Sequence, residues 1–208
     1  TSDEYGQTLS SGTATDSDSA NLVLALPMNG SSGGTTFTDY SATIKGSGSA
    51  KTVTPLGDVK TSTVQSKYYG SSGYFDGAGD YLTIPASSDF DFGTGDFTVE
   101  FWMFRTALTS YATIIDNNYG TSPNFLLQTS TSLGQRWRLY LNGISLSITE
   151  GSDHSLDTWH HYAVVRNGAG SNNVVIYRDG TSVATGTFTG NVGNASVVYG
   201  IGARPDGT

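Results

Sequence analysis

The chain contains no cysteine, which excludes disulfides, thiolate metal sites and a cysteine nucleophile. It also has no apolar run near the roughly 20 residues of a membrane-spanning helix, so we expect no membrane insertion. Positive charge is scarce: ten lysines and arginines stand against eighteen acidic residues, for a net charge of −8. Because such a chain repels phosphate backbones, we expect no nucleic-acid partner.

Strong helix formers are also scarce. Glutamate occurs only at Glu4, Glu100 and Glu150, and no convincing helical pattern is present. Glycine, by contrast, accounts for 27 of the 208 residues, nearly twice its usual share of about 7%. Serine, threonine, asparagine and aspartate are abundant as well. This composition predicts β-strands joined by many turns.

The sequence predicts two regions of unequal size. Residues 1–20 contain almost nothing to bury, and we expect an extended polar N-terminal arm there. Residues 21–208 form the predicted β domain, which is long enough to bury a sizeable core. Within it, Leu22–Leu26 is predicted as a short buried strand and Lys51–Val53 as an edge strand.

Alternating patterns are clearest in the second half of the chain. Phe97–Phe104 places bulky side chains on both faces, which predicts a central strand, and Trp159–Arg166 has the same character. Asn142-Gly143 and Asp179-Gly180 are typical hairpin turns between strands. The remaining strands are predicted at Ala112–Ile115, Asn124–Gln128, Trp137–Leu141, Ile144–Ile148, Asn173–Arg178, Ser182–Phe188 and Ser196–Ile201. About a dozen short strands at this spacing predict an antiparallel β-sandwich or jelly roll.

Several of these segments occur in the order of a known family. They are Tyr74-Phe75-Asp76-Gly77 with Asp80–Pro85, Asp96–Trp102, Trp159–Arg166, Tyr177–Gly180 and Ile201-Gly202. Together they resemble the laminin-G-like branch of the concanavalin A-like lectin/glucanase superfamily, over roughly residues 21–204. The resemblance implies an all-β jelly roll of two curved antiparallel sheets. Such modules occur in secreted, cell-surface and phage proteins, usually as binding or adhesion units.

The sequence lacks the last strand of the family pattern. After Arg204 the family normally continues with a glycine-rich turn and a further strand, whereas this sequence stops at Thr208. We therefore expect a jelly roll in which the last strand is missing or is supplied by a partner segment. An unfilled slot would leave exposed strand edges.

The sequence argues against catalysis. A retaining glycan hydrolase needs two carboxylates about 5–5.5 Å apart, and Glu100 has Thr98 and Trp102 at the neighbouring positions of its face. His160 and His161 lie on opposite faces of one strand, so we interpret them as packing and hydrogen-bonding residues. We predict that the protein is not an enzyme.

The strongest candidate binding site is the loop Asp116-Asn117-Asn118-Tyr119, which follows a predicted strand. Its oxygen atoms suit Ca²⁺, and the tyrosine ring suits sugar stacking. The placement resembles the pentraxin branch of the same superfamily, which implies Asp116 and Asn117 as calcium ligands. Asp206 would add a third calcium ligand, whereas Arg204 brings a cation to the same end and is a candidate sugar-binding residue together with this loop. The alternative is a solvated turn.

A second candidate is the pair Asp76 and Asp80, which flank a Gly-Ala-Gly segment. We favour an Asx-type turn here over a chelated ion.

We therefore predict a non-catalytic glycan-binding or adhesion module with an extracellular, cell-surface or virion-surface location. Its partners would be glycans or neighbouring subunits in a multivalent assembly. The alternative is a structural decoration, fibre or appendage subunit that exchanges an arm or strand with its neighbours. A glycan hydrolase is a distant third hypothesis.

Overall fold

The computed structural model describes residues 18–107, 111–117, 125–130, 136–142, 144–148, 155–193, 195–205 and 207. Within these residues the protein is nearly all β, and its sheets are antiparallel in a sandwich-like arrangement, as predicted. The chain divides into two compact units, one up to Pro85 and one from Ala86 onward. The described helices are too short and too polar to span a membrane. Most of the predicted arm, residues 1–17, lies outside the described residues.

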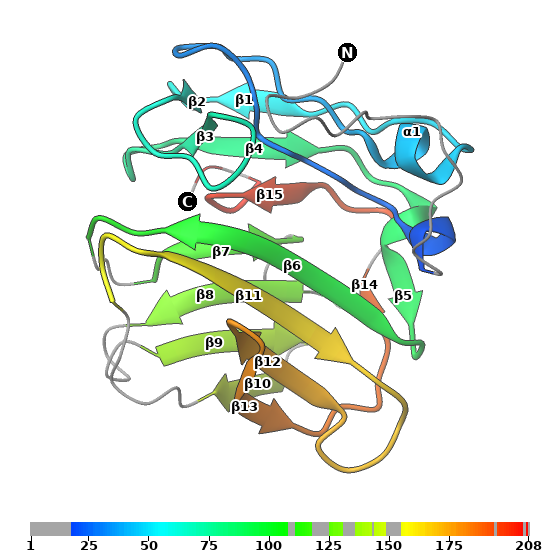
Figure 1. Cartoon of the computed structure of the whole chain (residues 1–208). Helices are drawn as coiled ribbons and strands as arrows, with labels where there is room; N and C mark the ends of the chain where they lie inside the picture. Colours follow the sequence, from blue (N-terminus) through cyan, green and yellow to red (C-terminus); the bar gives the residue numbers. More distant parts are fainter. Residues whose placement is uncertain are drawn as a thin grey trace. The chain divides into compact units, whose positions relative to one another are not determined.

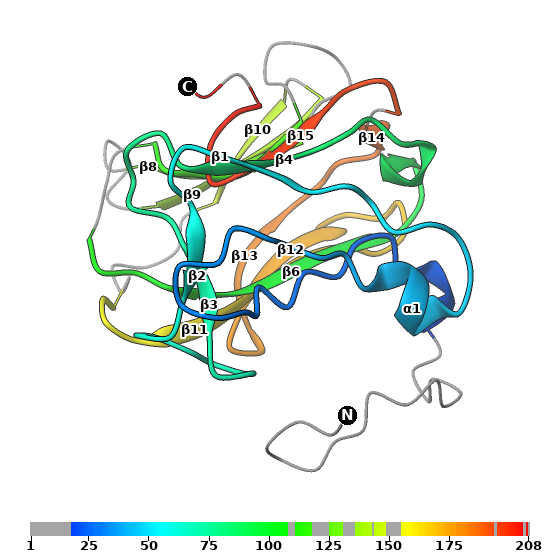
Figure 2. The ribbon, with the colours of Figure 1, turned by 90° about the horizontal axis from the view of Figure 1, so that it is seen from above.

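The first unit is built from short elements joined by long loops. In chain order they are η1 (Ser19–Asn21), α1 (Ser41–Lys45), β1 (Thr54–Leu56), β2 (Lys60–Ser62), β3 (Ser72–Tyr74) and β4 (Tyr81–Ile84). β1 pairs with β4 and β2 with β3, both antiparallel (Figure 1). α1 lies at the end of the unit opposite to β2 and β3 (Figure 2).

One buried carboxylate organises the loops of this unit. Asp39 accepts hydrogen bonds from the backbone N–H groups of Ala25, Ser41 and Lys51, at 2.9, 2.9 and 2.7 Å. It also accepts one from the Ser41 hydroxyl, at 2.8 Å. Burial alone would raise the pKa of Asp39, but these hydrogen bonds favour the ionised form and bring the pKa below its ordinary value.

The Asp39 contacts explain two corrections to the predicted elements. The prediction of a strand over Leu22–Leu26 was wrong, because Ala25 bonds to Asp39 and to the Tyr40 N–H instead of to a neighbouring strand. α1 was not predicted; Asp39 binds the N–H of its first residue, and Gly46 ends it with a left-handed φ of 74°. The predicted strand Lys51–Val53 is also displaced, since pairing begins at Thr54.

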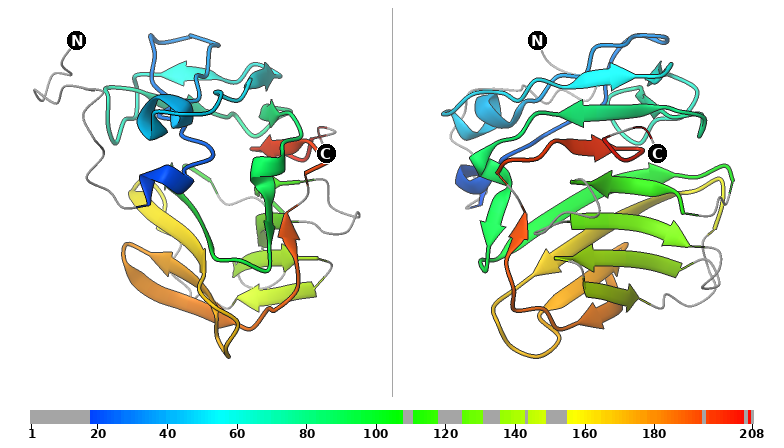
Figure 3. Two further views of the ribbon diagram at one scale, coloured as in Figure 1. Left: turned by 90° about the vertical axis from the view of Figure 1, so that its right-hand side faces the viewer. Right: turned by 180° about the vertical axis from the view of Figure 1, so that it is seen from behind.

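The second unit is a β-sandwich. Its elements are η2 (Ser88–Phe90), β5 (Asp91–Gly93), β6 (Phe97–Phe104), β7 (Thr113–Asp116), β8 (Phe125–Ser130), β9 (Arg136–Leu141), β10 (Ile144–Ile148), β11 (Trp159–Arg166), β12 (Val174–Arg178), β13 (Thr181–Gly186), β14 (Val192–Gly193) and β15 (Tyr199–Ile201). One layer has the strand order β13-β12-β11-β6, and the other contains the run β15-β7-β8-β9-β10. The two layers face each other (Figure 3).

The core of the second unit fills the space between these layers. Strands β8 and β9 contribute Phe125, Leu127, Trp137, Leu139 and Leu141, and strands β11 and β12 contribute Tyr162, Val164, Val174 and Ile176. The rings of Trp137 and Tyr162 meet across the two layers with their centroids 4.7 Å apart. Alternate residues of each strand supply these side chains, as expected of a sandwich.

The register of β11 confirms one strand prediction and corrects another. β11 lies between β12 and β6 and is central, as predicted. β6 was predicted to be central as well but is the end strand of its sheet. The bulk on its second face is explained by cross-strand ring pairs, because Trp102 packs on His161 and Phe104 packs on Trp159.

Arg166 ends β11 inside the protein, where it is 1% exposed. Its guanidinium donates to the carbonyl groups of Gly95 and Gly190, with Nε and Nη1 distances of 2.7 and 2.9 Å, and to that of Gly93 at 2.8 Å. Burial lowers the pKa of Arg166, and the nearby Asp96 carboxylate opposes this shift. One side chain thereby joins two separate segments, residues 93–95 and the loop at Gly190, to the central strand.

Replacing Arg166 by methionine should lower the free energy of unfolding by about 3 kcal/mol, because the carbonyl groups would lose charged donors inside the protein. Urea unfolding measures this change. Arg178→Met, on the neighbouring strand, is the control and should cost less than about 1 kcal/mol. Equal losses in both variants would contradict the structural role of Arg166.

The Asp39 contacts predict a specific pH dependence. Because the folded-state pKa is lowered, the stabilisation is present above the unfolded pKa and is lost as the pH falls through the folded pKa. At about pH 7, Asp39→Asn should be about 2 kcal/mol less stable than the wild type. The difference should shrink at about pH 3, as followed by urea unfolding. A difference that stays constant over this range would contradict the role of the charge.

Candidate functional site

The predicted rim site begins at the end of β7. Asp116 is the last residue of this strand and pairs with Gly200 of β15, and Asn117 follows it. Both side chains have no exposed surface. The other predicted residues of this site, Asn118, Tyr119 and Asp206, lie outside the described residues.

Asn117 is held by three hydrogen bonds. Its side-chain oxygen accepts the N–H of Phe125, its own N–H donates to the Phe125 carbonyl at 3.0 Å, and its amide nitrogen donates to the Tyr199 hydroxyl at 3.2 Å. The Tyr199 hydroxyl donates in turn to the Phe90 carbonyl at 3.3 Å. The Asn117 amide therefore joins β7, β8 and β15 inside the second unit.

Arg204 provides the charge partner of Asp116, with 3.5 Å between its Nε and the Asp116 Oδ2. The chain returns toward β15 to make this contact. A Cβ atom at Gly200 would lie 2.4 Å from the Ala203 carbonyl oxygen, so only glycine fits there. The sequence placed a cation at this end, and the structure brings it to the buried carboxylate.

These contacts bear on the predicted calcium site. Ca²⁺ needs several oxygen ligands that face one point. The Asn117 oxygen accepts a backbone N–H, and a guanidinium lies beside the Asp116 carboxylate. The described residues thus fit an internal ion pair better than a calcium site. Calcium binding stays a prediction.

The second predicted acidic group lies in the first unit. Asp76 accepts the N–H of Ala78 at 2.7 Å, which is the predicted Asx-type turn. Asp80 is 4% exposed and accepts the N–H groups of Asp58 and Asp76, at 2.7 and 2.9 Å. Oxygen atoms of Asp58, Asp76 and Asp80 lie within 4.8 Å of one another. These hydrogen bonds assign the Asp80 carboxylate to holding the loop backbone.

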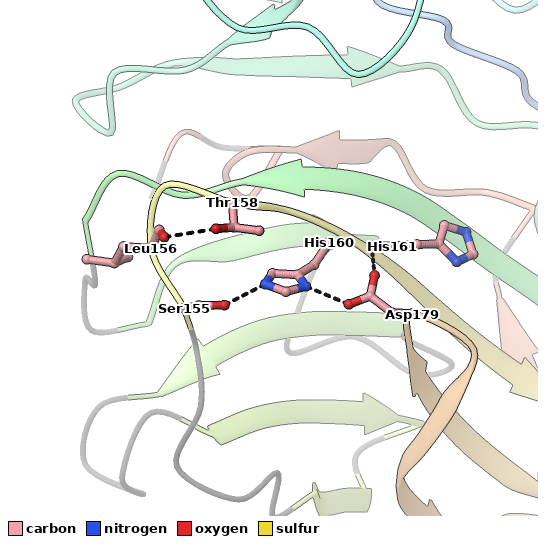
Figure 4. A network of polar contacts seen from close by, with 6 residues as sticks. All are labelled: Ser155, Leu156, Thr158, His160, His161 and Asp179. Carbon is pink, nitrogen blue, oxygen red and sulfur yellow. Dashed lines mark hydrogen bonds and ion pairs between the residues drawn. The ribbon is translucent and has the colours of Figure 1, made fainter.

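The first histidine of β11 belongs to a polar chain (Figure 4). His160 Nε2 lies 2.6 Å from the Ser155 Oγ, and its Nδ1 lies 2.6 Å from the Asp179 Oδ2. The other Asp179 oxygen accepts the N–H of His161 at 2.9 Å. Burial raises the pKa of Asp179, but the hydrogen bonds from His160 and His161 bring it below its ordinary value.

A serine, a histidine and an aspartate in this order are the groups of a catalytic triad. Here, however, the aspartate side chain is 46% exposed and forms part of the turn between β12 and β13. Its φ of 48° and its bonds to His161 make it a turn residue. We interpret the chain of contacts as a brace that fixes the start of β11 to this turn. The hydrogen-bonding role that the sequence predicted for His160 fits this geometry.

His161 points to the opposite face of the sheet, as the alternation of β11 predicts. Its Nε2 lies 3.4 Å from the Glu100 Oε2, and its ring packs on Trp102. Glu100 is 63% exposed and lies next to a histidine on this face. A hydrolytic role for Glu100 gains no support from this arrangement.

The structure also exposes three tyrosines that were not predicted as binding residues from the sequence. Tyr68, Tyr69 and Tyr74 are each about half exposed, at 53, 48 and 47%. All three belong to one segment, which we call the tyrosine hairpin: β2, β3 and their connection, residues 60–74. The signal in the sequence was an aromatic pair within a stretch of serine, glycine and lysine, where no core is expected.

The fold and a family comparison agree on the class of this protein. The family model of the concanavalin A-like lectin/glucanases superfamily, Laminin_G_3, matches residues 76–208, which is more than half of the chain. The chain therefore belongs to this superfamily, which confirms the resemblance seen in the sequence. No curated protein matches it.

Three solved structures illustrate the similarity. Domain 4 of AbnA, a GH43 extracellular arabinanase from Geobacillus stearothermophilus solved with arabinotriose, has a TM-score of 0.54 at 16% identity and covers 74% of each chain. The binding domain of Paraclostridial Mosquitocidal Protein 1 has a TM-score of 0.63 at 13% identity, over 87% of this chain and 44% of that one. The receptor-binding domain of botulinum neurotoxin D has a TM-score of 0.59 at 15% identity, over 89 and 45%. This chain thus spans less than half of each toxin domain.

Because Asp116 and Arg204 form a buried ion pair, we expect substitutions of the two residues to have non-additive effects on the free energy of unfolding. Arg204→Met alone should destabilise the second unit by about 3 kcal/mol, because it leaves a carboxylate buried without its cation. Adding Asp116→Asn should recover part of this loss, as measured by urea unfolding of the single and double variants. A melting temperature that rises with Ca²⁺ in the wild type but not in Asp116→Asn would overturn this account and establish the calcium site.

Proposed function

We propose that this protein is a non-catalytic glycan-binding module that acts outside the cell or on a virus surface. The observation that carries the proposal is the tyrosine hairpin, where aromatic rings lie at the surface of a fold whose core does not use them. Membership of a superfamily of lectins and glucanases supports it. Further support comes from the arabinanase domain solved with arabinotriose and from the toxin binding domains of similar fold.

The non-catalytic part of the proposal rests on the geometry of the carboxylates. Glycoside hydrolysis needs two carboxyl groups that flank the scissile bond, one of them kept protonated. Glu100 faces a histidine, and Asp80 has its oxygen atoms on backbone N–H groups. The ordinary role of these residues is structural.

Recognition would then rely on surface groups. A tyrosine ring stacks on the apolar face of a sugar, and hydroxyl and amide groups bond to the sugar hydroxyls. Each such contact contributes on the order of 1 kcal/mol, so a single site would bind weakly. Display of several copies on one surface would raise the overall affinity.

Binding to multivalent glycans tests this function. We expect the full chain, coupled to beads at high density, to bind at least one class of glycan on an array, with monovalent affinity near the millimolar range. The same array with EDTA reports whether metal contributes. A protein that is folded by circular dichroism and binds no multivalent glycan would contradict the proposal.

The bound glycans also test the absence of catalysis. Their length should stay unchanged after a day with the protein, and fluorophosphonate should not label Ser155. Released fragments, or labelling that His160→Gln abolishes, would show that the polar chain of Figure 4 is catalytic.

A further inference from the structure

We propose that the tyrosine hairpin is the glycan-binding site and that its ligand is an acidic glycan, which carries carboxylate or sulfate groups. This inference rests on the proposed function and adds a place and a ligand class to it. Three properties of the hairpin carry it: exposed rings, an ordered loop and lysines placed beside the rings.

The first property is aromatic exposure. Tyr68 and Tyr69 are adjacent, with ring centroids 6.3 Å apart and planes tilted by 56°. Val64, in the same connection, is 83% exposed. A folded protein gains nothing from leaving such groups in water, and clustered exposed apolar groups mark binding sites.

The second property is order without a core. The Ser66 hydroxyl donates to the Tyr68 carbonyl at 2.7 Å, and the Ser72 hydroxyl donates to the Gln65 carbonyl at 2.7 Å. The Ser71 hydroxyl, which is buried, accepts the N–H of Gly30 at 2.9 Å. A loop fixed in this way loses little conformational entropy when it binds a ligand.

The backbone also carries strain at the aromatic pair. Tyr69 has a φ of 60° in the left-handed region, which bulky side chains rarely adopt, and Gly70 follows with a φ of 72°. Strain of this kind is typical of binding and catalytic sites, where the surrounding contacts hold a side chain in position.

The third property is charge. Residues 60–74 contain Lys60 and Lys67 and no acidic residue, while Asp58 and Asp76 flank the segment. Lys60 lies opposite Tyr74 in the β2–β3 register, with its ammonium 5.7 Å from the ring centre and 3.6 Å from the Asp58 carboxylate. The Lys67 ammonium lies 5.8 Å from the centre of the Tyr68 ring. Each cation thus accompanies a ring at the surface, and because Lys60 also pairs with Asp58, Lys67 is the cation that the inference assigns to the acidic group of the ligand.

This pairing selects the ligand class. A ring offers a stacking face to a sugar, and an ammonium beside it offers a partner for an anionic substituent of the same sugar. A neutral glycan would use the rings alone. We therefore expect acidic glycans to bind more tightly than neutral ones of the same length, with a preference that salt weakens.

The test compares hairpin variants on defined probes. The acidic probes are a polymer bearing sialyllactose, hyaluronan and heparin, and the neutral probes are the same polymer bearing lactose, and dextran. Wild-type protein should bind at least one acidic probe more tightly than both neutral probes. Tyr68→Ala and Tyr69→Asn should each weaken that binding by roughly tenfold, and Lys67→Gln by roughly threefold with a smaller salt dependence.

Matched controls separate binding from folding. Asparagine tolerates the left-handed region, so Tyr69→Asn should not lower the melting temperature. Tyr111→Asn is its counterpart, since Tyr111 is 51% exposed with a φ of 59° but lies outside the hairpin. Lys45→Gln removes a lysine from α1 and is the control for Lys67→Gln. Both control variants should bind like the wild type.

The outcomes distinguish the two proposals. Wild-type protein that binds no glycan contradicts the proposed function itself. Glycan binding that the hairpin variants retain, or equal binding of acidic and neutral probes, overturns this inference and leaves the proposed function intact. Binding to phosphatidylserine vesicles, with no glycan bound and with loss in the hairpin variants, would assign the hairpin to a lipid surface instead.

Discussion

Arg166 ends the central strand of the sandwich with a charged group inside the protein. The second unit depends on the hydrogen bonds that pair this guanidinium with backbone carbonyl groups. A buried guanidinium is tolerated only when its donors are paired. The carbonyl groups of Gly93, Gly95 and Gly190 supply the partners, and the Phe97 ring lies 5.1 Å from the cation. Loops that flank β5, β6 and β14 are thereby fixed to β11. With β11 held in this way, its alternation places the side chains of Tyr162 and Val164 in the core.

The first unit is organised by a different means. Its strands are short, and carboxylates and hydroxyls add hydrogen bonds to the pairing of β1 with β4 and of β2 with β3. Asp39 and Asp80 each bind backbone N–H groups from separate loops, and Thr61 donates its hydroxyl to the Ser31 carbonyl at 2.5 Å. Ordered loops rich in serine and glycine are the result. They give the tyrosine hairpin a defined shape, which a flexible loop of the same composition would lack.

The sequence predicted the parts of the fold that depend on periodicity. β11 and β10 have the predicted bounds, because alternating bulk and Asn-Gly or Asp-Gly turns leave little freedom of register. It failed where side chains replace the strand ladder, as at Leu22–Leu26, whose partner is Asp39. It also failed to separate an end strand from a central one, because β6 forms ring pairs on its second face.

Asp116 and Arg204 were selected as neighbours, but the burial that makes them an ion pair depends on the tertiary fold. The exposure of Tyr68 and Tyr69 cannot be read from local pattern, since the described tyrosines range from buried, as at Tyr162, to half exposed, as at Tyr111.

We propose that the strands of the second unit have a structural role and that the tyrosine hairpin of the first unit binds the glycan. The most direct measurement is the change in backbone amide chemical shifts when sialyllactose or short fragments of hyaluronan and heparin are titrated into the protein. The account predicts that the largest changes fall within residues 64–74 for at least one of these ligands. Changes that centre on Ser155, His160 and Asp179, or on Asp116, would contradict it and place the binding site elsewhere.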